Sequence, residues 1–237
     1  MYKKKKDNLK NFLQIKNSTS TSADLYFYGD IVSDWWGAWD ETDQYPEQVK
    51  NFLDEAQGKD LNIYINSGGG SVFAGMTIYN MLKRHQGYKT VYVDGLAGSI
   101  SSVIALAGDK IVIPSNAYYM IHKPLGEIEG NANQLREHAD LLDKIEEGIL
   151  NVYSENLKEG IDIEIIKELV NAETWLTGIE ASKYFNIEVS EGIEVLNCVS
   201  DTFDRCKNLP KALWKDAQEE LKNKKEIEDL LLEIELA

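Results

Sequence analysis

Apolar residues between positions 61 and 122 of this 237-residue chain follow two alternating periods. Short β-rich runs such as LNIYIN and KTVYVD alternate with longer apolar segments of helical period, and glycine-rich breaks separate them. This alternation predicts an α/β fold with a mainly parallel sheet, because parallel neighbours are joined by crossover helices. The predicted strands are 61–66, 89–94, 110–114 and 117–122, and the predicted helices are 72–85 and 100–109.

The flanking sequence adds a strand and several helices. LYFYGDI at 25–31 predicts the first strand, and PEQVKNFLDEAQ at 46–57 predicts a helix with proline in its first turn. A long helix near 131–157 is predicted from an apolar stripe at i, i+3 and i+4 spacing. The stripe consists of Leu135, Leu142, Ile145, Ile149, Val152 and Tyr153. Helices at 162–171 and 179–185 follow, with ETWLTG as the connection between them.

Three segments are predicted along the chain. The stretch at 17–24 is polar, small and turn-rich, so we expect residues 1–23 to form a flexible arm and 24–195 to form the globular domain. Residues 196–237 form a charged tail, and its part after Pro210 has the pattern of an amphipathic helix. That helix either packs on the domain with a solvated face or serves as a coiled-coil or partner helix.

Charge and cysteine content narrow the class of protein. The net charge is -15 and the only basic cluster is Lys3–Lys6, which argues against binding to nucleic acid or to an anionic membrane surface. The apolar runs are too short for a signal peptide or a membrane span. Cys198 and Cys206 match neither a zinc knuckle nor a disulfide framework, so we expect reduced thiols, no metal site and a cytoplasmic protein.

Three tryptophans, Trp35, Trp36 and Trp39, lie among acidic residues between the first strand and the first helix. Exposed aromatic side chains are typical of a surface that binds a partner protein. The same residues also fit a cap over the core of the domain, and the sequence leaves both interpretations open.

Two glycine-rich breaks lie at the carboxyl ends of consecutive predicted strands, where ligands and catalytic groups gather in open α/β sheets. The first break, Ser67–Gly70, offers backbone N–H groups that can converge on an anion. No Lys-Ser/Thr pair follows it and the chain has no GxGxxG motif, which argues against a nucleotide site and leaves no cofactor predicted. The same N–H groups suit the oxyanion of an acyl-transfer reaction.

Three serines occupy the second break, GLAGS at 95–99, and the helical segment after it. Ser99 lies at the turn, where the helix dipole and free N–H groups favour an oxyanion. By itself, a serine in such a turn is typical of a helix N-cap. Ser101 and Ser102 lie half a turn further on, and we expect them to face the packed interior or a neighbouring helix.

Acyl transfer from a serine needs a base, and the chain has three histidines. His138 lies inside the long predicted helix among acidic residues, as a solvated or satisfied helix residue. His85 ends a predicted helix, where a cation favours the C-terminal dipole. His122 ends an apolar strand directly before Lys123 and Pro124, a position at which a functional side chain would be held.

Four motifs, in this order and spacing, resemble the ClpP family of serine peptidases. They are INSGGG with FAGMTIYNML, DGLAGSISSVIALAG, MIHKPLG and ETWLTGIEA, and the resemblance covers roughly residues 24–195. It implies the ClpP/crotonase-like α/β fold, with a spiral core of repeated β-β-α units and a long handle helix near 131–157, followed in this chain by the helical tail.

The resemblance also implies a catalytic site. Ser99 matches the nucleophile, His122 matches the general base, and the backbone N–H groups of Gly69 and Ile100 match the oxyanion donors. Glu173 lies where the family usually has an aspartate, and its carboxylate can still accept the imidazole N–H across a longer side chain. SGGG replaces the usual SPGG in the first loop, a change that keeps the N–H donors.

Within the family, the WWGAW segment, the ETW motif, the nucleophile turn and the charged tail resemble phage and prophage head maturation proteases. That group implies a cytoplasmic ring-shaped homo-oligomer that cuts capsid or scaffold protein through an acyl-enzyme, in the host cytoplasm or the assembling phage head. One alternative is the proteolytic subunit of an ATP-dependent Clp protease with an ATPase unfoldase partner. The others are a crotonase-type acyl-CoA enzyme and a non-catalytic scaffold relative.

Overall fold

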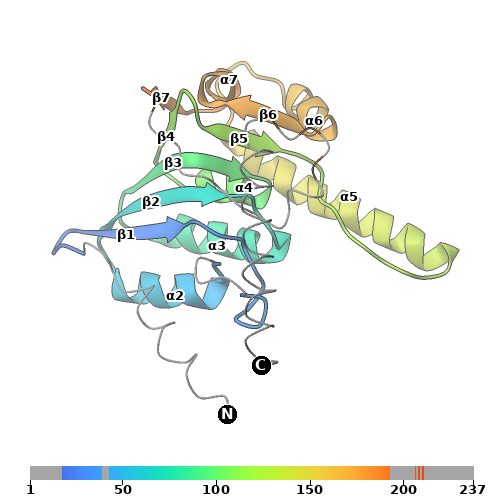
Figure 1. The fold of residues 1–237 in the computed structure, drawn as a ribbon, viewed down its shortest axis with the longest axis horizontal. Helices are drawn as coiled ribbons and strands as arrows, with labels where there is room; N and C mark the ends of the chain where they lie inside the picture. Colours follow the sequence, from blue (N-terminus) through green and yellow to red (C-terminus); the bar gives the residue numbers. More distant parts are fainter. Residues whose placement is uncertain (1–17, 39–42, 193–205, 207, 209, 211–237) are drawn as a thin grey trace, which may run out of the picture.

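A mixed α/β domain built on one twisted sheet forms the part of the chain that the computed structural model describes, residues 18–38, 43–192, 206, 208 and 210. Five strands lie side by side in the order β1-β2-β3-β4-β7, with every neighbouring pair parallel (Figure 1). β5 pairs in parallel with β3, and β6 pairs antiparallel with β5. The strands are β1 (Ser22–Phe27), β2 (Asp60–Ser67), β3 (Lys89–Gly98), β4 (Lys110–Pro114), β5 (Tyr118–Ile121), β6 (Thr174–Thr177) and β7 (Glu188–Ser190). The predicted α/β class with a mainly parallel sheet is confirmed.

Alternating side chains give the sheet one buried face and one aromatic face. Successive residues of a strand point to opposite sides, so register partners on neighbouring strands line up on the same face. One such row, Leu25, Ile63 and Val91, is at most 1 % exposed. The next row, Tyr26, Tyr64 and Tyr92, stacks on the other face with ring centroids 4.7 Å and 5.3 Å apart.

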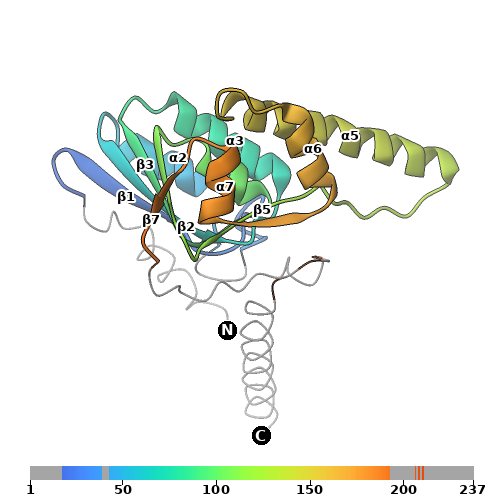
Figure 2. The same ribbon diagram turned by 90° about the horizontal axis from the view of Figure 1, so that it is seen from above.

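The helices cover the buried face of the sheet. They are α2 (Pro46–Glu55), α3 (Val72–Arg84), α4 (Ile100–Ala105), α5 (Ala132–Glu155), α6 (Ile163–Asn171) and α7 (Gly178–Tyr184). Figure 2 shows α3, α5 and α6 on the same side of the sheet. Short α4 is central, because it contacts α3, α5 and the strands β2, β3 and β5. It ends earlier than the helix predicted over 100–109 and is buried throughout.

Strand β3 changes its neighbour along its length, and this corrects one prediction. The sequence predicts a break at GLAGS, but residues 95–98 of this stretch form the second half of β3. The first half of β3 pairs with β4 and the second half with β5. Between the pairs Ile65↔Val93 and Ser67↔Ala97, β3 advances four residues while β2 advances two. This irregularity in the ladder hides the strand from a period-2 pattern.

The ETWLTG segment gives a second correction. Its residues 174–177 form strand β6 rather than a simple connection. The strand is only four residues long and pairs on the far side of β5, so its sequence carries too few alternations to be detected. The short edge strand β7 was not predicted for the same reason, and β1 begins at Ser22, within the segment assigned to the N-terminal arm.

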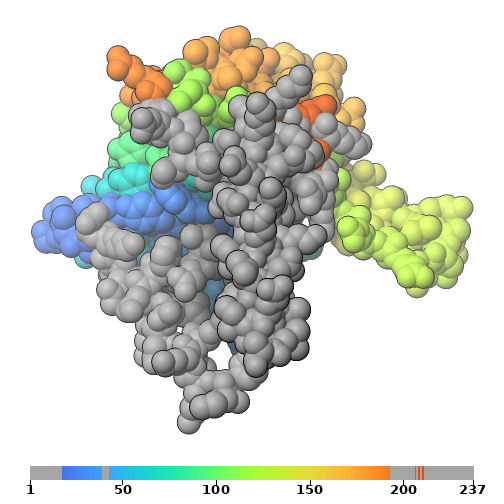
Figure 3. Space-filling model, in the orientation of Figure 1, coloured from blue at the N-terminus to red at the C-terminus, as the bar shows by residue number. Residues whose placement is uncertain are grey.

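Helix α5 is only partly covered by the rest of the domain. Its predicted apolar stripe is buried at the C-terminal half, where Ile149, Val152 and Tyr153 lie in the core. At the other half Leu135 is 46 % exposed, and this half projects beyond the body of the domain (Figures 1 and 3). No helix within the described ranges combines the length and the apolar composition that a membrane span needs.

The loop after β1 places its tryptophans outward. Trp35 and Trp36 stack on each other with ring centroids 4.1 Å apart and are 55 % and 73 % exposed. These two residues therefore do not cap the core, whereas Trp39 lies outside the described residues. Cys206 forms no disulfide with another described residue, whereas Cys198 and the predicted tail helix after Pro210 lie outside the described residues.

Candidate active site

The ends of three neighbouring strands bring Ser99, His122 and Glu173 together. Ser99 directly follows β3, and its N–H donates to the Met120 carbonyl of β5 at 2.9 Å. His122 directly follows β5, and Glu173 directly precedes β6. The antiparallel register ends at Ile121↔Thr174, with His122 and Glu173 next to this last pair, and the charge of Glu173 acts on His122. Residues far apart in the chain thus meet at one edge of the sheet.

Ser99 has a strained backbone and an unusual hydrogen bond. Its φ of 53° and ψ of -126° lie outside the regions that a non-glycine residue prefers. Although it occupies the N-cap position of α4, its side chain makes no cap hydrogen bond. Its Oγ lies 2.7 Å from His122 Nε2 instead. The geometry therefore excludes a simple capping role and matches a nucleophile paired with a base.

The environment of His122 keeps its imidazole neutral near pH 7. Burial lowers the pKa of His122 from its ordinary value, while the nearby charge of Glu173 acts in the opposite direction. Burial is the larger effect, because it removes water that would stabilise the imidazolium. A neutral imidazole can accept a proton at Nε2, the atom that faces Ser99 Oγ.

The first glycine loop lies directly beside the Ser99 turn. Gly69 has a φ of +106°, and a Cβ at this position would lie 2.6 Å from Ser99 Cβ and 3.1 Å from Ile100 N. Glycine is therefore required both by the backbone conformation and by the close approach of the two loops. The predicted donors Gly69 and Ile100 are adjacent in space, and the Gly69 N–H donates to Ser67 Oγ at 3.2 Å.

Ser101 ties the two loops to each other. It is fully buried, as expected, and its Oγ lies 2.8 Å from the Ser67 carbonyl and 2.7 Å from the Gly98 carbonyl. One carbonyl precedes the glycine loop and the other precedes Ser99. The hydroxyl thus holds the two turns in register, a role that the sequence pattern did not reveal.

Ser102 supports the Ser99 turn from the core. Its Oγ donates to the Ser99 carbonyl at 2.5 Å and lies 2.8 Å from the Tyr153 hydroxyl of α5. The Tyr119 hydroxyl donates to the Ser102 carbonyl at 2.8 Å. Two buried tyrosines therefore fix the turn that carries Ser99, and the expectation that Ser102 faces the interior is confirmed.

Glu173 also lies on a strained turn. Its φ is 52°, and its N–H donates to the Val170 carbonyl at 3.2 Å at the end of α6. Its Oε1 accepts the backbone N–H of Asn208 at 2.9 Å. Sequence reasoning missed Asn208, because a single asparagine in a charged tail gives no signal of contact with a residue so distant in the chain.

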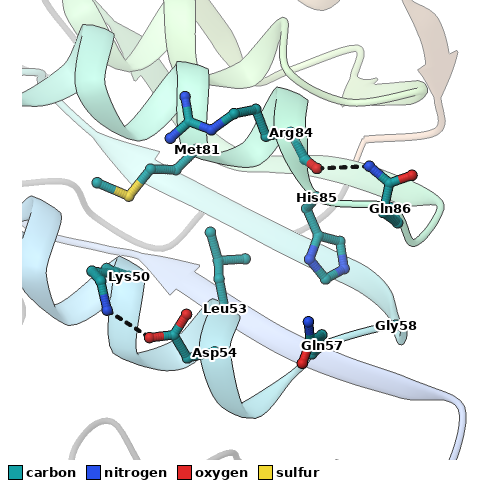
Figure 4. A pocket seen from close by; sticks show the side chains of 9 residues that line it. All are labelled: Lys50, Leu53, Asp54, Gln57, Gly58, Met81, Arg84, His85 and Gln86. Carbon is teal, nitrogen blue, oxygen red and sulfur yellow. Dashed lines mark hydrogen bonds and ion pairs between the residues drawn. The ribbon is translucent and has the colours of Figure 1, made fainter.

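The other two histidines lie away from Ser99. His85 lines a hollow of about 370 Å³ between α2 and α3 (Figure 4), and its Nε2 lies 2.7 Å from the Lys59 carbonyl. His138 is half-buried on α5 against Gly126, and its Nε2 has no hydrogen-bond partner among the described residues, contrary to the expected solvated or satisfied side chain. Only His122, of the three, contacts Ser99 within the described structure.

Comparison with known proteins identifies the family of the chain. The profile of the Clp protease family matches residues 40–188, which include Ser99, His122 and Glu173. The chain belongs to the Clp protease family. The predicted relationship to ClpP-type serine peptidases is thereby confirmed at the level of the family.

A relative within the Clp protease family is the ATP-dependent Clp protease proteolytic subunit of Porphyromonas gingivalis. It is 33% identical over 141 residues, a stretch that covers 58% of this chain and 62% of the relative. The chain thus matches less than two thirds of the relative's length. Residues 206–210, which include Asn208, lie beyond the part that the family profile matches.

Proposed function

We propose that this protein is a serine endopeptidase that hydrolyses peptide bonds through an acyl-enzyme, with Ser99 as nucleophile and His122 as general base. The observation that carries the proposal is the 2.7 Å contact between Ser99 Oγ and His122 Nε2 at a strained turn. Membership of the Clp protease family supports the same activity. Ser99 and His122 are both partly exposed, so a peptide can reach them.

The reaction follows from the positions of these atoms. His122 Nε2 takes the Ser99 Oγ proton as Oγ bonds to the peptide carbonyl carbon, and the carbonyl oxygen becomes an oxyanion. When the C–N bond breaks, the imidazolium returns the proton to the leaving amine. Water then repeats the sequence on the acyl-enzyme, which releases the acid and restores Ser99.

Backbone N–H groups beside Ser99 stabilise the oxyanion. Ile100 N–H lies at the start of α4, where the helix dipole favours negative charge, and Gly69 N–H approaches from the glycine loop. To bind the oxyanion, Gly69 N–H must turn away from Ser67 Oγ.

Glu173 completes the triad in this proposal. Its carboxylate faces the imidazole from the opposite strand end and raises the pKa of His122 against the larger effect of burial. A carboxylate in this position fixes the imidazole tautomer and stabilises the imidazolium that forms during the reaction. The family match and the position of Glu173 before β6 support the assignment.

The relative from Porphyromonas gingivalis favours a proteolytic subunit of an ATP-dependent Clp protease over the head maturation protease suggested by the tryptophan loop and tail. We therefore assign this chain a general protein substrate, delivered by an ATPase unfoldase to a homo-oligomeric ring with the ClpP/crotonase-like spiral fold. The projecting half of α5 supplies the handle of such a ring.

Serine labelling tests the activity. A fluorophosphonate probe should modify Ser99 in the purified protein, and peptide mapping should locate the adduct. Ser99→Ala should abolish both labelling and hydrolysis of fluorogenic peptides, with a loss of roughly 10⁴-fold or more in kcat. Ser182→Ala, which removes a hydroxyl that donates only to the Ile179 carbonyl on α7, is the control. An unlabelled Ser99 would rule out the proposed activity.

The two interpretations of the biological role differ in what stimulates hydrolysis. A Clp subunit should degrade casein faster when ATP and a Clp-type unfoldase are added, and short peptides should be cut without either. A head maturation protease should ignore the unfoldase and cut a capsid or scaffold protein at defined positions. Casein degradation that is insensitive to ATP and unfoldase would contradict the assignment to a Clp subunit.

A further inference from the structure

Asn208 makes three hydrogen bonds to the turn that carries Glu173, although 35 residues separate the two in the chain. Its backbone N–H donates to Glu173 Oε1 at 2.9 Å. Its side-chain Nδ2 donates to the Ala172 carbonyl at 3.0 Å and to the Glu173 carbonyl at 3.2 Å. One residue thus binds both the carboxylate and the backbone of the same turn.

The Glu173 turn needs such support for two reasons. A non-glycine residue with a φ of 52° stores roughly 1–3 kcal/mol of strain, which the surroundings must offset. A glutamate also ends in a broad torsion about its carboxylate, so an unrestrained side chain samples many orientations. A triad requires one orientation, in which an oxygen faces the imidazole.

Cys206, two residues before Asn208 in the chain, packs against the domain within reach of the charge of Glu173. Its side chain is half-buried beside Tyr118 and Trp175, against the cluster of Leu96 and Met120. Burial and the nearby charge of Glu173 raise the pKa of the Cys206 thiol to about 11. The thiol is therefore protonated at neutral pH and packs as a small apolar group.

We propose that Asn208 is a positioning residue for Glu173, and that its N–H holds Oε1 so that Oε2 is directed to His122 Nδ1. This inference rests on the proposed peptidase function and extends it to a segment beyond residue 188, where the family match ends. The side-chain amide of Asn208 holds the two carbonyls of the strained turn at the same time. Asn208, which lies outside the matched part of the chain, thereby contributes to the catalytic geometry.

Two substitutions distinguish the backbone hydrogen bond of Asn208 from the hydrogen bonds of its side-chain amide. Asn208→Pro removes the backbone N–H that binds Oε1, and Asn208→Ala removes only the amide bonds to the carbonyls. We expect Asn208→Pro to lower kcat for a fluorogenic peptide by about 10- to 100-fold with little change in KM, and Asn208→Ala to have a smaller effect. Asn186→Ala, which removes an exposed amide bond to the Leu157 carbonyl, is the matched control.

A double-mutant cycle distinguishes positioning from a general structural role. If Asn208 acts through Glu173, Asn208→Pro should have no further effect on kcat in a Glu173→Ala background, which lacks the oxygen that accepts the Asn208 N–H. A loss of the same size in both backgrounds would overturn the proposal. Unchanged kcat in both Asn208 variants, with a clear loss in Glu173→Gln, would overturn it as well.

Titration of His122 by NMR tests the contact between Asn208 and Glu173 without any measurement of catalysis. Because Glu173 raises the pKa of His122, both Glu173→Gln and Asn208→Pro should lower it, whereas Asn186→Ala should leave it unchanged. An unchanged His122 pKa in Asn208→Pro would contradict the proposed positioning. A wild-type protein that shows this coupling but no peptidase activity would contradict only the proposed function.

Discussion

At the scale of single residues, Ser99 and Glu173 stand out because they are the two non-glycine residues with positive φ in the described part of the chain. Strain of about 1–3 kcal/mol each persists only where neighbouring bonds determine the conformation. Ser99 is held by its N–H on the Met120 carbonyl and by Ser102 Oγ on its own carbonyl. Ser99 and Glu173 both lie next to His122. The backbone strain is therefore concentrated around the imidazole.

The pH dependence of activity should report the environment of His122. Its pKa is lowered by burial, so we expect the acidic limb of kcat/KM to fall below pH 6.5, the ordinary value for histidine. Glu173 opposes that shift, so Glu173→Gln should move the limb to still lower pH and reduce kcat by roughly 10³- to 10⁴-fold. A pH–rate profile for peptide hydrolysis measures both effects.

Glu146→Gln is the control for loss of a nearby carboxylate. Glu146 pairs with Lys123, the residue after His122, at 3.1 Å, whereas the carboxylate that raises the pKa of His122 is that of Glu173. Substitution of Glu146 should leave the acidic limb in place. An acidic limb that moves to higher pH in Glu173→Gln would contradict the assigned electrostatic role of Glu173.

At the scale of elements, the site depends on two strand-to-helix turns that must keep a fixed distance. The turn from β2 to α3 carries Gly69, and the turn from β3 to α4 carries Ser99. The backbones approach so closely that a single methyl group at Gly69 would overlap Ser99. The Ser101 hydroxyl joins the two turns because it contacts one carbonyl beside each of them. Since Ser101 is fully buried, a water molecule cannot replace this hydroxyl.

Ser101→Ala should therefore affect both stability and activity. It leaves two buried carbonyls without their hydroxyl donor, so we expect the free energy of unfolding to fall by about 1–3 kcal/mol. It should also lower kcat more than KM, because the oxyanion donors lose their position relative to Ser99. Urea unfolding and steady-state peptide hydrolysis are the measurements. Wild-type stability and kcat in this variant would show that Ser101 does not tie the turns.

At the scale of the whole molecule, the domain has a compact sheet and one projecting helix. The N-terminal half of α5 exposes Leu135 and Leu141, which are 46 % and 47 % exposed, and Leu125 and Ile128 before it are 53 % and 45 % exposed. Figure 3 shows this end of the molecule standing clear of the body. Apolar residues collected on a projecting element favour contact with a second copy, in agreement with the proposed ring.

Charges on this helix should weaken assembly. We expect wild-type protein to sediment as an oligomer at micromolar concentration, and Leu135→Glu with Leu141→Glu to shift it to smaller species, with association weaker by about 100-fold or more. Glu137→Gln, an exposed change on the same helix, should assemble like wild type. A wild-type protein that sediments only as a monomer, or a doubly substituted protein that assembles normally, would contradict the handle role of α5.

Periodicity was sufficient for the strands and helices that alternate regularly. β2, α3 and the first half of β3 were predicted because each strand alternates over several residues and each helix buries one stripe. β6 and the second half of β3 were missed, since one is four residues long and the other contains a register shift. Both segments are strands because they pair with neighbouring strands, and no local sequence pattern marks them.

The sequence by itself determined the α/β class, the first glycine turn at 67–70 and the candidates Ser99 and His122, because these follow from local periods and from motifs of fixed spacing. Only the tertiary structure decided that Ser99 Oγ meets His122 Nε2 instead of capping α4, and that Asn208 binds Glu173. The tertiary structure also showed that Ser101 connects the two turns through hydrogen bonds and does not serve in packing alone. Contacts between strand ends depend on sheet pairing and register, which arise from residues distant in the chain and leave no local pattern.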